Sequence, residues 1–112
     1  MPRRDPVRDR IAELDHACLD LADGVERLRT ALGQVRTMRE RGQRVSEILA
    51  FGPAAPARRQ VRESWARLNR ALHAYRVQAV KSMIDNEGMS IADAARVTGN
   101  ARQVVSRLYH EA

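Results

Sequence analysis

The fold is decided largely by residues 5–35, which read DPVRDRIAELDHACLDLADGVERLRTALGQV. Asp5 can accept hydrogen bonds from the first free amides of a helix, and Pro6 loses nothing by lacking an N–H at the first helical position. Apolar residues then recur at alternating steps of four and three, whereas a strand would need steps of two. This spacing predicts an amphipathic helix from about Pro6 to about Leu49, weakened near its three glycines.

The apolar row has the a and d spacing of a coiled coil. A single helix cannot bury such a row, so it must pack on the second half of the chain, on another copy or on a different protein. We predict a homodimer. An intrachain hairpin is an equally open alternative, and both together would give a four-helix dimer. The residues predicted to contribute to dimerisation are Ile11, Leu14, Cys18, Leu21, Val25, Leu28, Leu32 and Val35.

A second long helix is predicted after residues 51–56, whose sequence FGPAAP holds one glycine and two prolines and indicates a turn. Pro56 suits the first position of this helix, and Gly88 suits the left-handed residue just beyond its end. Its apolar residues repeat with the same period as those of the first helix, which favours antiparallel packing of the two. We expect Trp65 and Tyr75 to lie in their shared core.

Residues 88–109 read GMSIADAARVTGNARQVVSRLY and contain the signals of a short helix. Ser90 is a natural N-cap, and Asp93, three residues later, completes an acidic variant of the capping box. These signals predict a helix over about 91–98. Ala95 is the small residue expected where this helix crosses the next one closely.

A last helix is predicted over about 101–110, after a turn at Gly99, which tolerates positive φ. Asn100 is expected to cap this helix. Val105 and Leu108 are three apart and should pack on the preceding helix. Two short helices joined in this way form a helix-turn-helix.

That packing leaves polar side chains of the last helix pointing outward. Arginine is suited to guanine and glutamine to adenine in the major groove of DNA. We predict base contacts from Arg102, Gln103 and Arg107, and phosphate contacts from Ser90, Arg96, Lys81 and Ser106.

The C-terminal third, about residues 72–112, is similar to the trihelical, homeodomain-like helix-turn-helix modules of bacterial resolvases, transposases and small transcription regulators. The matching residues are Val80, Ile84, Glu87, Gly88, Ser90, Ile91, Ala94, Ala95, Gly99, Arg102, Val105 and Leu108. The resemblance implies a three-helix fold that binds duplex DNA. That family usually has an apolar residue and then serine after the turn glycine. This chain has Asn100 and Ala101 there, which moves the predicted cap back by one residue.

Charge and composition narrow the function classes. The 112 residues hold 20 Lys and Arg against 14 Asp and Glu, a net charge of +6. Residues 57–112 carry +5 of it, and such an excess attracts polyanions. The single cysteine excludes an intrachain disulfide. The three histidines lie far apart in the sequence, and no phosphate-binding loop or carboxylate pair is evident. We therefore expect no enzyme activity, cofactor or metal site.

The sequence also has no apolar run long enough to cross a bilayer and no signal peptide, so we expect a cytoplasmic, nucleoid-associated protein without a membrane partner. The predicted fold is all-α, a long antiparallel helical hairpin or coiled coil followed by a C-terminal helix-turn-helix. Residues 1–56 would form the dimerisation helix and hinge. Residues 57–112 would form the long helix that leads into the DNA-binding module, with its motif at about 77–110.

The predicted function is sequence-specific binding of double-stranded DNA by a homodimer, as in a small bacterial transcription regulator. Two alternatives stay open. The first is an interaction protein whose N-terminal helix docks on a larger protein partner. The second is a nucleoid protein that coats DNA without sequence preference.

Overall fold

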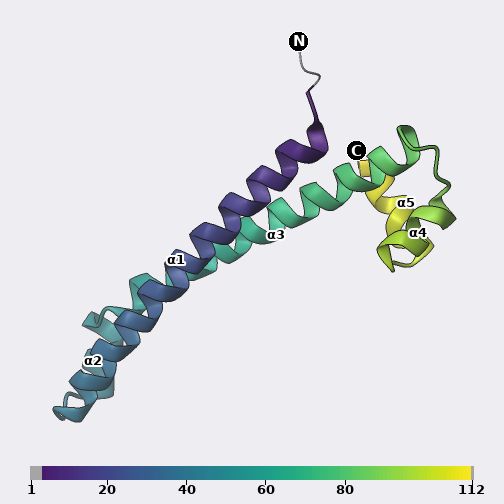
Figure 1. Cartoon of the computed structure of the whole chain (residues 1–112). Helices are drawn as coiled ribbons and strands as arrows, with labels where there is room; N and C mark the ends of the chain where they lie inside the picture. The colour runs from purple at the N-terminus through teal and green to yellow at the C-terminus, as the bar shows by residue number, and fades with distance from the viewer. Residues whose placement is uncertain (1–3, 112) are drawn as a thin grey trace. The chain divides into compact units, whose positions relative to one another are not determined.

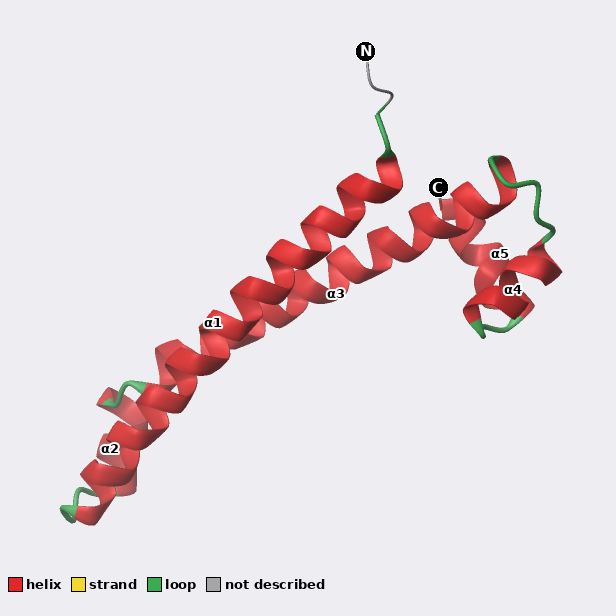
Figure 2. Ribbon diagram, viewed as in Figure 1, coloured by secondary structure: helices red, strands yellow, loops and turns green. Residues whose placement is uncertain are grey.

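The computed structural model describes residues 4–111, which form helices and short loops without any strand (Figure 2). In chain order the helices are α1 (Pro6–Glu40), α2 (Val45–Phe51), α3 (Ala54–Asp85), α4 (Ile91–Thr98) and α5 (Arg102–Glu111) (Figure 1). The all-α prediction is therefore confirmed. None of the described helices combines the length and apolar character that crossing a membrane requires. The chain divides into two units, one of residues 16–69 and the other of residues up to 15 with those from 70 onward.

Helix α1 begins as predicted. The carboxylate of Asp5 accepts hydrogen bonds from the amides of Val7 and Arg8, both at 3.1 Å. These bonds satisfy two of the backbone donors that a helix start leaves free. Pro6 occupies the first helical position, where its missing N–H costs nothing.

The predicted end of this helix near Leu49 is wrong, because α1 stops at Glu40. Gly42 has a φ of 83°, a left-handed conformation that glycine adopts cheaply, and it turns the chain out of the helix. Val45, Ile48 and Leu49, which fall within the predicted range, belong to the separate α2, which buries Ile48.

The predicted turn at residues 51–56 is also shorter than expected. Helix α2 continues to Phe51, and the Gly52 amide donates to the Ile48 carbonyl at 2.8 Å. Helix α3 already begins at Ala54 rather than at Pro56. Proline is tolerated there because the first turn of a helix has no partners for its amides.

In the unit of residues 16–69, α1 packs antiparallel against α3 (Figure 1). A Cβ atom built on Gly24 would lie 3.6 Å from Val61 Cγ2 and 3.8 Å from Val61 Cα. The guanidinium of Arg67 forms an ion pair with Asp20, so an earlier residue of α1 meets a later residue of α3. The intrachain hairpin, one of the three packing alternatives for the apolar row, is thus present.

Small residues make this close packing possible. The buried positions of α1 are Ala17, Gly24 and Ala31, which repeat every seven residues. Leu21 and Leu28 lie half-buried beside them. The residues of α1 that contact α3, which we call the contact line, therefore lie along one edge of the predicted apolar row. The sequence reasoning missed the small residues of this contact line.

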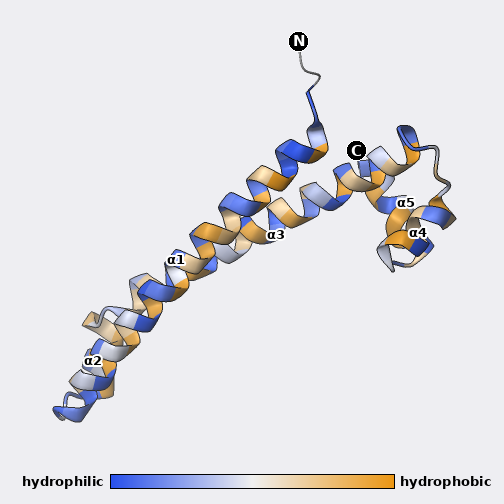
Figure 3. Ribbon diagram, in the orientation of Figure 1, coloured by the Kyte–Doolittle hydropathy of each residue, from blue (hydrophilic) through white to orange (hydrophobic). Residues whose placement is uncertain are grey.

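The other edge of the row remains exposed. Val25 is 41% exposed and Leu32 is 49% exposed, and Cys18 is also exposed. Hydrophobic residues recur along α1 and α3 among hydrophilic ones in Figure 3. Hairpin packing thus uses only part of the apolar surface of α1.

Trp65 joins these exposed residues, at 55% exposure, so its predicted place in the core is wrong. Both helices of the hairpin are right-handed and they run in opposite directions. A residue that directly follows a contact position on one helix therefore lies on the same side of the hairpin as a residue that directly follows a contact position on the other. Cys18, Val25 and Leu32 each follow a buried residue of α1, and Trp65 follows the half-buried Ser64. We call these four residues the hairpin face.

Candidate nucleic-acid interface

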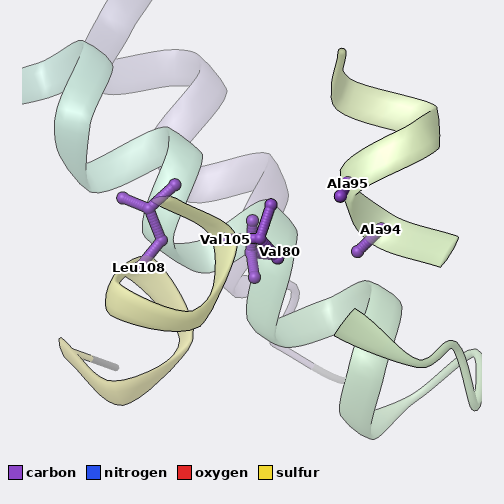
Figure 4. Close-up of a cluster of buried hydrophobic side chains, with 5 residues drawn as sticks. All are labelled: Val80, Ala94, Ala95, Val105 and Leu108. Atoms are coloured by element: carbon purple, nitrogen blue, oxygen red, sulfur yellow. The ribbon is translucent and has the colours of Figure 1, made fainter. Parts of the chain in front are cut away.

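The C-terminal helices assemble around a small aliphatic core (Figure 4). Val80 of α3 and Val105 of α5 are almost fully enclosed, and Leu108 is 5% exposed. Ala94 and Ala95 supply the contact surface of α4, and their small size suits the close approach of helices. The predicted packing of Val105 and Leu108 on α4, and the buried Ala95, are confirmed.

The start of α4 is held by the predicted capping box. Ser90 Oγ accepts from the Asp93 amide at 3.1 Å, and Asp93 Oδ2 accepts from the Ser90 amide at 3.3 Å. The hydrogen bonds from Ser90, with a smaller contribution from Arg96, lower the pKa of the Asp93 carboxyl below its ordinary value of 3.8. The carboxylate therefore stays ionised where the helix dipole favours a negative charge.

The turn between α4 and α5 is made by Gly99, whose φ of 71° confirms the predicted left-handed residue. The amides of Gly99 and Asn100 both donate to the Ala95 carbonyl, which closes the end of α4. Such bonds are typical of a helix that ends on glycine.

The predicted cap of α5 by Asn100 is wrong. Helix α5 begins at Arg102, and the amides of Val104 and Val105 donate to the carbonyl of Ala101 at 3.1 and 3.2 Å. Ala101 thus holds the N-cap position and has no side-chain oxygen to offer. Asn100 instead belongs to the preceding turn, where its backbone N–H donates to the Ala95 carbonyl.

Two polar contacts hold the other end of α5 on α3. The Tyr109 hydroxyl donates to Asp85 Oδ1 at 2.7 Å, and His73 Nε2 lies 2.5 Å from Glu111 Oε2. The first bond lowers the pKa of the Asp85 carboxyl and raises that of the Tyr109 hydroxyl above its ordinary value of 10.0. Sequence reasoning missed both pairs, because partners 24 and 38 positions apart leave no local signal.

The predicted base-contacting residues lie together on α5. Arg102 and Gln103 occupy its first turn and Arg107 follows one turn later, and all three are exposed. Ser106 lies between them in sequence and is half-buried. Within the part of the chain that the structure describes, neither arginine forms an ion pair. Their guanidinium donors are thus available to an outside acceptor.

The predicted phosphate contacts on α3 and α4 have partners within the protein. Arg96 forms an ion pair with Asp93, and Lys81 Nζ lies 3.3 Å from Asp85 Oδ2. The Ser90 hydroxyl oxygen accepts the capping bond, although its proton can still be donated. A phosphate would compete with a carboxylate for Arg96 and Lys81.

Comparison with known proteins gave no relative of this chain: no family model, no curated protein and no solved structure matches it. The resemblance to the resolvase and transposase modules therefore stays a prediction, carried by the residues and geometry described above.

Proposed function

We propose that this protein binds double-stranded DNA sequence-specifically and that α5 is its recognition helix. The observation that carries the proposal is the two-sided character of α5. One side is fixed in the core by Val105 and Leu108, and the other presents Arg102, Gln103 and Arg107 to the outside. A helix of this kind fits the major groove of B-DNA, where base edges are distinguishable.

In this proposal Arg102 and Arg107 donate to guanine and Gln103 pairs with adenine. Each good bidentate pair discriminates against a wrong base by about 1–3 kcal/mol. Ser106, on the same helix, donates to a phosphate oxygen. Lys81, Ser90 and Arg96 add contacts to DNA phosphates, which carry no sequence information. The loss of these contacts should therefore weaken binding to all duplexes alike.

We also propose that two copies associate through the hairpin face. Cys18, Val25, Leu32 and Trp65 form an apolar row on one side of the hairpin, and a second copy can cover it with the same row. Two hairpins would then form a four-helix arrangement. A homodimer of this kind reads two half-sites spaced by about one helical turn or a multiple of it.

The experiment selects duplexes from a random pool with the full chain and then measures affinity by fluorescence anisotropy. The double variant Arg102→Ala/Arg107→Ala should lose most of the preference for the selected duplex over a random one. The matched control, Arg4→Ala/Arg8→Ala, removes the same charge at exposed positions and should keep that preference. A preference that survives in the α5 variant would contradict the assignment of α5.

A second candidate function rests on the same exposed hairpin face, because a helix of a larger protein partner could cover it instead of a second copy. Solution mass decides between the two. Twice the mass of one chain, reduced to a single chain by Trp65→Asp, supports self-association. A monomer at high concentration favours the interaction protein.

The binding experiment also tests the remaining alternative. Equal affinity for selected and random duplexes would favour the nucleoid protein.

A further inference from the structure

A strong concentration of positive charge lies outside the helix-turn-helix in the sequence. Residues 27–62 hold nine arginines against two acidic residues, a net of +7 that exceeds the charge of the whole chain. These residues form the end of α1, α2 and the start of α3, all within the unit of residues 16–69 (Figure 1). We call residues 27–62 the basic tip.

Most arginines of the basic tip have no acidic partner. Three are neutralised locally, since Arg27, Arg29 and Arg44 pair with neighbouring carboxylates at 2.8–3.4 Å. Among residues 4–111, the other six form no ion pair, and all of them are exposed: Arg36, Arg39, Arg41, Arg58, Arg59 and Arg62. The positive charge is thus presented to the solvent.

Like charges within one part of a molecule repel each other, and a polyanion relieves that repulsion. We propose that the basic tip is a second nucleic-acid surface, which binds the phosphate backbone of duplex DNA without reading its sequence. This inference stands apart from the proposed function, because it needs no contact from α5.

The residue types favour phosphates. All cationic side chains of the basic tip are arginines, and the guanidinium fork matches phosphate oxygens with two parallel hydrogen bonds. A duplex carries one negative charge per ~1.7 Å of its axis, so several arginines can contact it together and release its counterions.

An anionic bilayer is the competing polyanion. Val45, Leu49 and Phe51 are exposed on α2, and Phe51 is 87% exposed. Helices that lie in a membrane interface need an extended apolar face, whereas α2 has seven residues and turns Ile48 inward. The observations therefore favour the duplex, and the bilayer becomes an arm of the test.

The test measures binding of the full chain to a random 30-base-pair duplex between 50 and 200 mM salt. The variant Arg41→Gln/Arg59→Gln neutralises two exposed arginines of the basic tip, neither of which lies on the hairpin face. The control Arg4→Gln/Arg8→Gln removes the same charge outside the tip. Circular dichroism checks that both variants stay helical.

We expect the tip variant to lower the slope of log affinity against log salt by about 1.8, or ~0.9 for each lost phosphate contact. Its affinity at 50 mM salt should fall roughly tenfold or more, and the control should stay close to wild type. Equal affinities and slopes for the two variants would overturn the inference.

The second arm measures cosedimentation with vesicles that contain phosphatidylserine. If the tip variant loses vesicle binding while its duplex binding equals that of the control, the surface binds bilayers and the inference is wrong. The proposed function fails separately, since it requires a preference for a selected duplex that Arg102→Ala/Arg107→Ala removes.

Discussion

The close contact between Gly24 and α3 gives the sharpest stability test of the hairpin. A Cβ at Gly24 would lie in ordinary contact with Val61, at 3.6 Å from Cγ2 and 3.8 Å from Cα. Gly33, also in the interior of α1, is exposed and would meet nothing within 4 Å. The two glycines thus share a helix and differ in whether α3 faces them.

Alanine at either position should stabilise the protein by about 1 kcal/mol, the helix-propensity difference from glycine. Leucine substitutions should affect the stability of the protein differently at the two glycines. Gly33→Leu should gain about 0.8 kcal/mol, because its side chain extends into open space. Gly24→Leu gains the same propensity but must push the additional carbons against the α3 backbone, and such overpacking typically costs about 1–3 kcal/mol.

The assay is thermal unfolding followed by circular dichroism. With an unfolding entropy of ~2.1 cal/mol/K per residue, a 112-residue chain shifts its Tm by about 4 °C per kcal/mol. Gly24→Leu should therefore melt roughly 4–12 °C below Gly33→Leu, whereas the two alanine variants melt together above wild type. Equal melting of the two leucine variants would mean that Gly24 does not face α3.

Three further predictions concern the C-terminal helices. Ala101→Ser supplies an N-cap side-chain oxygen that can accept from the Gln103 or Val104 amide, and it should stabilise the protein by about 0.5–2 kcal/mol, read as a rise in the urea midpoint. No rise would show that α5 starts elsewhere. Leu108→Ala empties a buried position and should cost about 2–5 kcal/mol in the same assay, and a loss under 1 kcal/mol would contradict its place in the core. Asp93 has a folded pKa below its ordinary 3.8, so its contribution is present above that pH and is lost as pH falls through the folded value. The Tm advantage of wild type over Asp93→Asn should therefore shrink from pH 6 to pH 2, and a constant advantage would refute the capping role.

The sequence predicts the helix-turn-helix well because its signals are local. Ser90, Asp93 and Gly99 each act through hydrogen bonds or backbone angles within a few residues, and the structure has all three as expected. The predicted cap of α5 was wrong because Asn100 is the better capping residue by type, whereas α5 begins one residue later and has Ala101 at its N-cap position.

The side of α1 that packs in the hairpin was harder to predict, because apolar residues lie along both edges of the row. Nothing in the spacing of Leu21 and Val25 says which one faces a partner. Ala17, Gly24 and Ala31 carry that information, since small residues repeated every seven positions permit close packing. The predicted core position of Trp65 was wrong for the same reason. Trp65 fits the apolar period of its helix but lies outside the contact line.

The end of α1 shows a further limit of periodicity. The regular apolar row ends at Val35, yet apolar residues resume off its register up to Leu49, and they were read as one helix where the structure has two. Gly42 is one of the three glycines expected to weaken the helix, and its left-handed φ makes it the break. Each glycine in a long helix thus needs to be weighed as a stop.

The most direct test of the central claim is a ¹⁵N-labelled titration of the full chain with a selected duplex at 150 mM salt, followed by amide chemical shifts. If α5 is the recognition helix, the amides of Arg102 to Arg107 move most within the C-terminal helices, and random duplex moves them far less. If those amides stay in place while the duplex binds, α5 does not enter the groove and the proposed function is wrong.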